Sequence, residues 1–132
     1  MEQHFKDIRE NQKASWDKFS PGWKKWDLEL HDHMKPAADG IVNLLKPAGS
    51  QLILDIAAGT GELGFSIASM LIEGKVIITD LSDEMLNIAR ENAIRKEISN
   101  VEFRACDVCE LPFANDTFDA ISCRMGFMFF PD

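Results

Sequence analysis

LILDIAAGTGELG, residues 52–64, is the most informative segment of the chain. The apolar residues 52–54 predict a buried strand of a parallel sheet. Gly59 and Gly61 allow the next turn to bend tightly and to approach a ligand without a Cβ in the way. We expect a helix at residues 61–72, because apolar positions there keep helical spacing. The free amides at the start of that helix would face a molecule bound over the strand end.

Asp55 lies just before this turn and indicates the charge of the ligand. A carboxylate at this position would repel a pyrophosphate, whereas it would attract a cation. Two unit charges about 4 Å apart gain about 4 kcal/mol at an effective dielectric of 20, before desolvation is subtracted. The segment therefore favours a small cationic ligand over a diphosphate.

Strands and helices alternate after the turn. We expect strands at residues 51–56, 75–80, 101–106 and 117–123, with a helix at residues 82–97. The serine that opens this helix is a favourable N-cap, and two acidic residues follow it in the first turn. Alternation of this kind predicts a parallel sheet with right-handed crossovers.

The first 46 residues are helical and aromatic in character. We expect helices at residues 4–19, 22–34 and 36–46, with a break at Ser20-Pro21-Gly22 and with Pro36 in a first turn. Residues 1–46 would form a helical extension or lid and residues 47–132 an α/β unit, the two making one compact domain.

Four stretches together resemble one known family. DIAAGTG, residues 55–61, resembles the first motif of class I S-adenosylmethionine-dependent methyltransferases, in the alanine-containing variant found among ubiquinone/menaquinone-type enzymes. KVIITDLSDEML, residues 75–86, resembles the second strand with its ribose-binding acid, and FRACDV, residues 103–108, the third strand with its adenine-binding acid. FDAISC, residues 118–123, resembles the fourth strand.

This resemblance implies an α/β fold: a Rossmann-like, doubly wound parallel sheet of strand order 3-2-1-4 with an N-terminal helical extension. It also implies a methyltransferase that uses S-adenosylmethionine, releases S-adenosylhomocysteine and acts on a small, hydrophobic acceptor. Such enzymes continue through three more strands. We therefore expect the C-terminal strands to be missing. The chain would be an N-terminal portion, inactive alone, a homodimer that pairs through the exposed fourth strand, or a variant with a different ending.

The resemblance also assigns residues to the cofactor. Asp80 would accept from the ribose hydroxyls and Asp107 from the adenine amino group, while Met85 would pack on the ring. The expected cofactor-binding set is Asp55, Ala57, Ala58, Gly59, Thr60, Gly61, Asp80, Leu81, Met85, Cys106, Asp107, Val108 and Cys123. Ordinary interpretations remain open: both acids could be solvated loop residues and Met85 a core residue. Arg124 is a candidate for the cofactor's methionine end.

The catalytic base is not identified by the sequence. His31 and His33 are candidates, although solvated positions on a helix are the more ordinary interpretation. Trp16, Trp23 and Trp26 would either line an apolar acceptor pocket or pack the N-terminal helices onto the sheet.

Two other functions remain open. GTGELG, residues 59–64, also satisfies the G-x-G-x-x-G pattern of NAD(P)- and FAD-binding proteins, and Asp80 lies near the distance of their ribose acid. Asp55 and the strand ending near Asp107 argue against that class. The chain could also be a noncatalytic binding or assembly module with a methyltransferase-like fold.

Composition narrows the partners. The 132 residues include 45% hydrophobic and 27% charged residues, and the formal net charge is −8, so nonspecific binding to nucleic acid or to an anionic membrane is not expected. No apolar run approaches the roughly 20 residues that span a bilayer, and no secretory signal is evident, so we expect a cytoplasmic protein. Cys106, Cys109 and Cys123 are expected to be reduced thiols without a metal.

Overall fold

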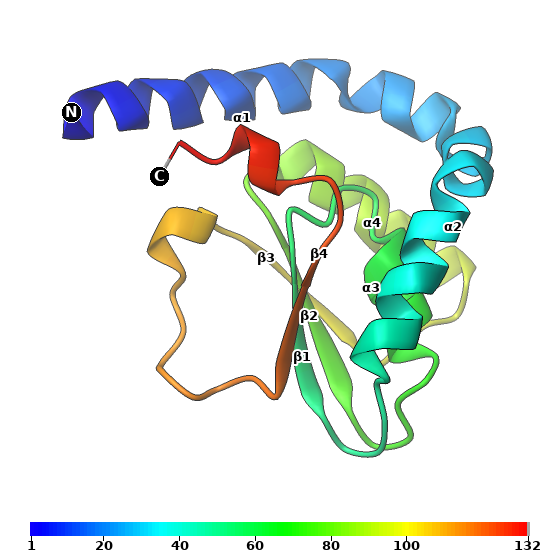
Figure 1. The fold of residues 1–132 in the computed structure, drawn as a ribbon. Coiled ribbons are helices and arrows are strands. Elements are labelled where there is room, and N and C mark those ends of the chain that lie inside the picture. Colours follow the sequence, from blue (N-terminus) through cyan, green and yellow to red (C-terminus); the bar gives the residue numbers. More distant parts are fainter. Residues whose placement is uncertain (132) are drawn as a thin grey trace.

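A parallel four-stranded sheet forms the centre of the computed structural model, which describes residues 1–131 (Figure 1). The strands are β1 (Leu52–Ile56), β2 (Lys75–Asp80), β3 (Val101–Ala105) and β4 (Ala120–Cys123). They lie in the order β3-β2-β1-β4 and all pairs are parallel, which confirms the predicted order. The order reverses between β1 and β4, and open sheets of this type bind ligands beside the carboxyl ends of the strands at such a point.

Strand β4 is shorter than the predicted strand at residues 117–123 because Asp119 bonds to β1 through its side chain. Its Oδ2 accepts from the Leu52 amide at 2.7 Å, while its own amide donates to the Leu52 carbonyl at 2.8 Å. The regular ladder then starts with Ala120 opposite Ile53.

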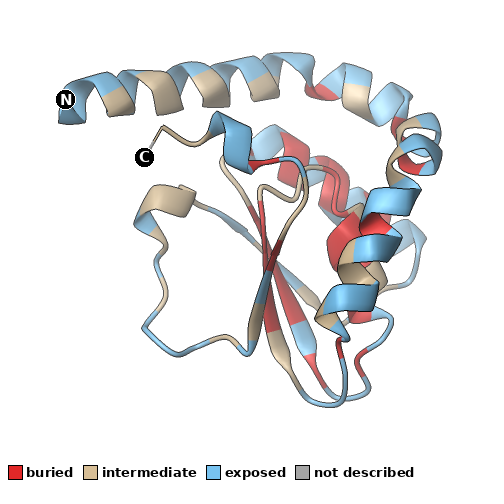
Figure 2. Cartoon of the chain, in the orientation of Figure 1, coloured by how far each residue is buried: buried red, intermediate tan, exposed pale blue. Residues whose placement is uncertain are grey.

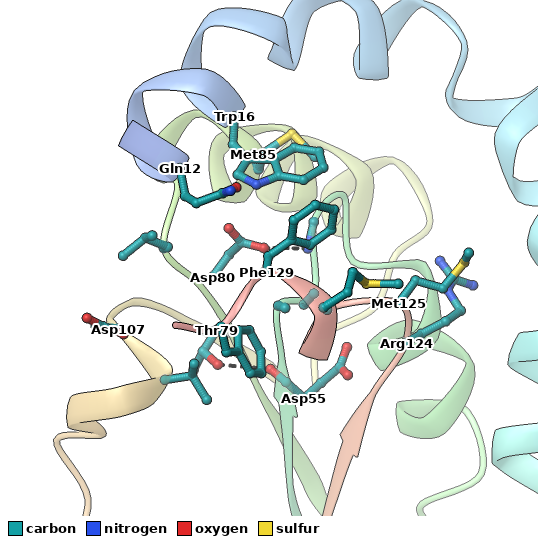
Figure 3. Close-up of a pocket in the computed structure, with 18 of the residues that line it drawn as sticks. Gln12, Trp16, Asp55, Thr79, Asp80, Met85, Asp107, Arg124, Met125 and Phe129 are labelled. Atoms are coloured by element: carbon teal, nitrogen blue, oxygen red, sulfur yellow. Dashed lines mark hydrogen bonds between the residues drawn. The ribbon is translucent and has the colours of Figure 1, made fainter. Parts of the chain in front are cut away.

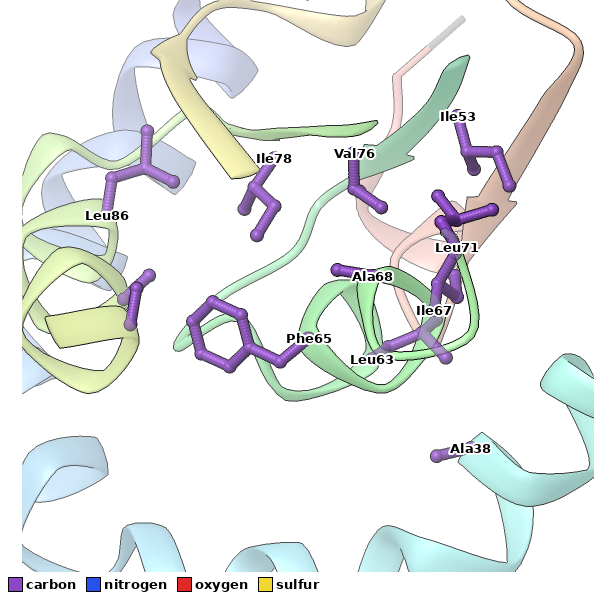
Figure 4. Packing of buried hydrophobic residues seen from close by; sticks show 12 residues of the cluster. Ala38, Ile53, Leu63, Phe65, Ile67, Ala68, Leu71, Val76, Ile78 and Leu86 are labelled. Atoms are coloured by element: carbon purple, nitrogen blue, oxygen red, sulfur yellow. The ribbon is translucent and has the colours of Figure 1, made fainter. Parts of the chain in front are cut away.

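Three helices cover one face of the sheet: α2 (Asp27–Leu45), α3 (Glu62–Ala68) and α4 (Asp83–Arg95) (Figures 1 and 2). Ile53 and Ile78 point into this layer and are fully buried (Figure 4). Burying one such side chain stabilises the fold by about 1.5–3 kcal/mol. The other buried members are Ala38, Leu63, Phe65, Ile67, Ala68, Leu71, Val76, Leu86, Ala89 and Ala93.

The opposite face has a different cover. Leu54, Ile56 and Ile77 are buried there beneath the irregular segment 106–119 and the end of the described chain. The residues that pack against them include Val108, Leu111, Phe113, Phe118 and Phe130. This cover includes the short 3-10 helix Val108–Glu110, and a second 3-10 helix, Phe127–Phe129, directly precedes Phe130. None of the residues named as packing here belongs to an α-helix.

The start of α4 follows the predicted pattern. The Ser82 hydroxyl accepts from the Met85 amide at 3.1 Å, so Ser82 is the N-cap. Asp83 and Glu84 occupy the first turn, where the helix dipole favours anions. Leu86 is fully buried against the sheet.

The prediction of three N-terminal helices was wrong. Helix α1 runs from Glu2 to Lys25 through Pro21, and the chain bends at Trp26 instead, before α2 begins. Proline at position 21 removes the amide that would bond to the Asp17 carbonyl. The Ser20 hydroxyl donates to that carbonyl at 2.9 Å, so the helix continues.

Pro36 was also predicted to open a helix, and the structure contradicts this. Pro36 lies in the interior of α2, which begins at Asp27. The prediction of helices at residues 22–34 and 36–46 was therefore wrong. A proline in a helix interior is tolerated when the surrounding packing compensates for the lost hydrogen bond, and a local pattern does not show that packing.

Helix α1 crosses the carboxyl ends of the strands (Figure 1). It is joined to α4 by polar contacts. The Ser82 hydroxyl donates to Asp17 at 2.5 Å, and Lys13 Nζ lies 3.2 Å from Asp83. Further along, Lys24 pairs with a glutamate of α4 at 2.6 Å. We call α1 the roof helix, because it lies over the strand ends where the turn of residues 57–61 is found.

Gly64 lets α3 approach the sheet closely. A Cβ on Gly64 would lie 2.9 Å from the Ile78 side chain and 3.2 Å from Asp55 Oδ2. Gly40, in contrast, lies on the exposed side of α2, and a Cβ there would meet nothing within 4 Å.

We predict that Gly64→Val lowers the free energy of unfolding by about 1–3 kcal/mol, since the added atoms overpack the contact with Ile78. The matched control Gly40→Ala should raise it by about 0.5–1 kcal/mol, because alanine favours the helix. Urea unfolding monitored by circular dichroism measures both. Equal stability of Gly64→Val and the unaltered chain would contradict the close packing of α3.

Candidate functional site

A cavity of about 330 Å³ lies between the carboxyl ends of the strands and the roof helix (Figure 3). Its volume falls in the range of small-molecule sites. The predicted residues that line it are Asp55, Ala57, Ala58, Gly59, Thr60, Asp80, Leu81, Met85, Cys106, Asp107 and Val108. Gly61 and Cys123 do not line it. Gly61 caps α3, and Cys123 packs against the second face of the sheet.

The turn of residues 57–61, which we call the glycine turn, has an unusual backbone. Ala57, Gly59 and Gly61 have φ angles of 52°, 59° and 94°. A Cβ on Gly61 would lie 2.6 Å from the Phe65 ring, so glycine is required there on both conformational and steric grounds. The Ala58 amide donates to a β2 carbonyl at 3.0 Å, which ties the turn to the sheet.

Asp80 ends β2 and holds two backbone amides. Its Oδ2 accepts from the Gly59 amide at 2.8 Å and its Oδ1 from the Ser82 amide at 2.9 Å. Burial raises the pKa of Asp80, and the hydrogen bonds from these amides act in the opposite direction. The carboxylate therefore has a fixed orientation at the cavity, with lone pairs left for a ligand.

Asp55 lies in β1 beneath the glycine turn and is fully buried. Its Oδ1 accepts from the Ser122 hydroxyl at 2.7 Å, while Oδ2 has no hydrogen-bond partner within residues 1–131. Burial raises the pKa of Asp55 to about 7, although Ser122 and the Arg124 charge act in the opposite direction. Arg124 Nη1 is likewise buried without a partner in the described chain. Unpaired polar atoms of this kind are costly, and both residues border the cavity.

Asp107 follows β3 and is held by two groups. Its Oδ1 accepts from the Cys109 amide at 2.9 Å, and its Oδ2 lies 2.8 Å from Arg9 Nε of the roof helix. This acid thus contacts α1 directly, a link that the sequence alone did not indicate.

Burial raises the pKa of Cys106, so its thiol is a poor nucleophile. No group of His, Cys, Asp and Glu side chains in residues 1–131 has an arrangement that holds a metal ion.

The roof helix contributes four residues to the cavity. Trp16 and Trp23 were candidates for an acceptor pocket on the sequence, whereas Arg9 and Gln12 were not assigned. Arg9, Gln12, Trp16 and Trp23 line the cavity and recur at helical spacing on one face of α1. The Trp16 ring centroid lies 5.3 Å from that of Phe129 in an edge-to-face contact and 5.8 Å from that of Trp23. The helical repeat of these positions was the signal that could have identified them.

Other predicted residues lie elsewhere. Trp26 is 52% exposed, and His33 is exposed. His31 is buried between helices and does not border the cavity. Further lining residues that sequence analysis did not assign are Met34, Leu63, Thr79, Cys109, Met125, Gly126, Met128, Phe129, Phe130 and Pro131.

A profile described as a methyltransferase domain matches residues 53–132, more than half of the chain. The chain belongs to the methyltransferase-domain family. The matched region contains the glycine turn together with Asp80 and Asp107, whereas the roof helix lies outside it.

Methyltransferases of known sequence and structure resemble the chain. It is 40% identical over 76 residues to the ubiquinone/menaquinone biosynthesis C-methyltransferase UbiE of Cellvibrio japonicus, covering 56% of this chain and 30% of that protein. The UbiE protein of Brucella canis is 34% identical, with 92% of this chain and 49% of the relative covered. The chain thus spans less than half the length of these relatives.

Among solved structures, the fold resembles phosphoethanolamine N-methyltransferase 1 of Haemonchus contortus, whose structure contains phosphoethanolamine and S-adenosylhomocysteine. The TM-score is 0.77 at 20% identity, and the match covers 93% of this chain and 26% of that one. At this identity the likeness concerns the fold.

We predict that the methyltransferase domain loses stability as pH rises between about 4 and about 7, in part because of Asp55. Its pKa is higher in the folded chain than in the unfolded chain, so its contribution is fully present below pH 4 and is lost as pH rises through about 7. The free energy of unfolding of Asp55→Asn should therefore rise by about 2 kcal/mol relative to that of the unaltered chain when the pH is raised from 5 to 8. Urea unfolding at the two pH values measures this difference, and a stability difference that does not change with pH would contradict the raised pKa of the buried carboxyl.

Proposed function

We propose that the chain is the cofactor-binding portion of an S-adenosylmethionine-dependent methyltransferase that acts on a small, hydrophobic acceptor. The observation that carries this proposal is the row of acids at the carboxyl edge of the sheet. Asp55, Asp80 and Asp107 belong to or follow three adjacent strands, and all three line one cavity with the glycine turn. Such an edge suits a cationic nucleoside.

The residues fit the parts of this cofactor. Asp80 has a fixed carboxylate that would accept from the ribose hydroxyls. Asp107 would accept from the adenine amino group, with Cys106 and Val108 beside the ring. S-adenosylmethionine, when bound, supplies an activated methyl group, so the protein needs chiefly to orient the two reactants and to exclude water.

The methionine end of the cofactor carries an ammonium and a carboxylate. Asp55 and Arg124 both border the cavity, and each has one buried polar atom without a partner in the described chain. A zwitterionic ligand bound directly or through water would compensate both charges. The Asp55 carboxyl, whose Oδ2 lacks a partner in the described chain, favours a cation over an anion at this position.

A dinucleotide is the weaker candidate. A diphosphate at the glycine turn would need the free Gly59 amide, but this amide already donates to Asp80. Asp55 lies buried beneath the same turn, and Glu62 opens the following helix. These three acidic groups would repel a diphosphate.

We predict that the chain binds S-adenosylhomocysteine and does not bind NAD, as measured by calorimetry. Asp80→Asn should weaken S-adenosylhomocysteine binding about tenfold or more, because hydrogen bonds to a charged acceptor contribute about 1.5–3 kcal/mol. Asp32→Asn, an exposed position on α2, is the matched control and should bind normally. Unchanged affinity of Asp80→Asn, or a preference for NAD, would overturn the proposal.

The acceptor would occupy the aromatic part of the cavity. Trp16 and Trp23 of the roof helix, with Met128 and Phe129, give this part an apolar lining. The relatives named above act in ubiquinone and menaquinone biosynthesis, which agrees with an apolar ring as acceptor.

We predict that Trp16→Ala weakens binding of 1-naphthol, a simple apolar ring probe, at least threefold in the presence of saturating S-adenosylhomocysteine. The reason is the loss of the edge-to-face contact partner of Phe129. Trp26→Ala is the control, since Trp26 is exposed and lies outside the cavity. Calorimetric titration measures both, and an equal effect of the two substitutions would argue against an acceptor site beneath α1.

Residues 1–46 would act as a lid over residues 47–132. The protein would be cytoplasmic and would not bind nucleic acid, in keeping with a net charge of −8. No helix in residues 1–131 has the length and apolar character to span a membrane.

Two alternatives are a homodimer that pairs through β4 and a noncatalytic binding role. Light scattering tests the first, and a methyl-transfer assay tests the second.

A further inference from the structure

A buried polar cluster adjoins the glycine turn outside the cavity. It contains Asp27 and His31 of α2, Glu62 at the start of α3 and Asn92 of α4, none of which lines the cavity. Asp27, His31 and Asn92 are at most 9% exposed. Removing such groups from water costs free energy unless they are hydrogen-bonded. Their hydrogen-bond partners therefore show which segments of the chain the cluster joins.

Asn92 connects α2 to the glycine turn. Its Nδ2 donates to Asp27 Oδ2 at 3.0 Å and to the Thr60 carbonyl at 3.1 Å. Its Oδ1 accepts from Arg95 Nη2 at 2.7 Å. The amide is thus bonded on both sides and has one orientation, in which one of its hydrogens is directed at the turn backbone.

A second contact lies just beyond Gly61. Glu62 Oε2 lies 3.3 Å from His31 Nδ1 and 3.0 Å from Lys96 Nζ. The residues on both sides of Gly61 are therefore held by side chains of α2 and α4. Thr60 lines the cavity, whereas the groups that hold it do not.

The glycine turn needs such support. Ala57, Gly59 and Gly61 all have positive φ, and alanine in this region of conformational space is strained. A strained conformation persists only where the surrounding structure holds it. On the cavity side Asp80 holds the Gly59 amide, and on the opposite side Asn92 holds the Thr60 carbonyl.

We propose that Asn92, fixed by Asp27, is a positioning residue for cofactor binding: its bond to the Thr60 carbonyl holds the glycine turn in the conformation that receives the ligand. The effect on cofactor affinity rests on the proposed function. The effect on the rigidity of the turn does not.

The test compares Asn92→Asp with Asn87→Asp in the 132-residue chain. Asn92→Asp keeps the side-chain shape but removes the donor and turns a carboxylate toward the Thr60 carbonyl and Asp27. Hydrogen exchange of the backbone amides of residues 58–61 should become at least tenfold faster, and S-adenosylhomocysteine should bind at least fivefold more weakly. Asn87 is exposed on the same helix, so Asn87→Asp should change neither quantity.

A double variant separates positioning from general stability. In Asp27→Asn with Asn92→Asp, the new amide at 27 donates to the new carboxylate at 92, so the bond between α2 and α4 returns with its direction reversed. The Thr60 carbonyl still lacks a donor. We expect the melting temperature to recover toward that of the unaltered chain, while exchange in residues 58–61 stays fast and affinity stays low.

Two results would overturn the inference. One is recovery of exchange and affinity together with the melting temperature, which would mean that Asn92 acts through stability alone. The other is unchanged exchange in Asn92→Asp. Failure of the unaltered chain to bind S-adenosylhomocysteine would instead contradict the proposed function, and the exchange comparison would still decide whether Asn92 positions the turn.

Discussion

The half-buried carboxylate of Asp80 is the group on which the rest of the site depends. It accepts from the amides of Gly59 and Ser82, and so joins the end of β2 to the glycine turn and to the start of α4. Burial of the charge is unfavourable, and two charge-assisted hydrogen bonds offset part of this cost. Since both segments are attached to one side chain, the cavity wall beneath the roof helix has a defined shape before any ligand enters.

Much of the fold was predictable because its determinants are local. The apolar runs gave nearly correct bounds for β1 and β2, the glycines marked the start of α3, and the Ser82 cap marked the start of α4. The end of α3 was predicted wrongly, since the helix ends at Ala68 and not at residue 72. The N-terminal helices were not predictable in the same way. Pro21 normally ends a helix, and only the hydrogen bond from the Ser20 hydroxyl to the Asp17 carbonyl shows why it does not here.

The positions of the acids at the strand ends could be predicted far better than the contacts of the roof helix. Asp55, Asp80 and Asp107 come at or near the ends of strands, so a parallel sheet necessarily gathers them at one edge. The roof depends on where α1 crosses that edge, which no local pattern specifies. The pairing of Arg9 with Asp107 is a contact of this kind, since nearly 100 residues separate the partners in sequence.

The attachment of α1 has a consequence for how the protein responds to its surroundings. Of the residues of this helix only Ser20 is buried, and charged pairs such as Lys24 with Glu91 and Lys13 with Asp83 join it to α4. Dissolved ions screen exposed pairs strongly, since the Debye length falls from about 10 Å at 0.1 M to about 3 Å at 1 M ionic strength. Rising ionic strength should therefore weaken these exposed pairs between α1 and α4, while the apolar interior of the sheet is unaffected by screening.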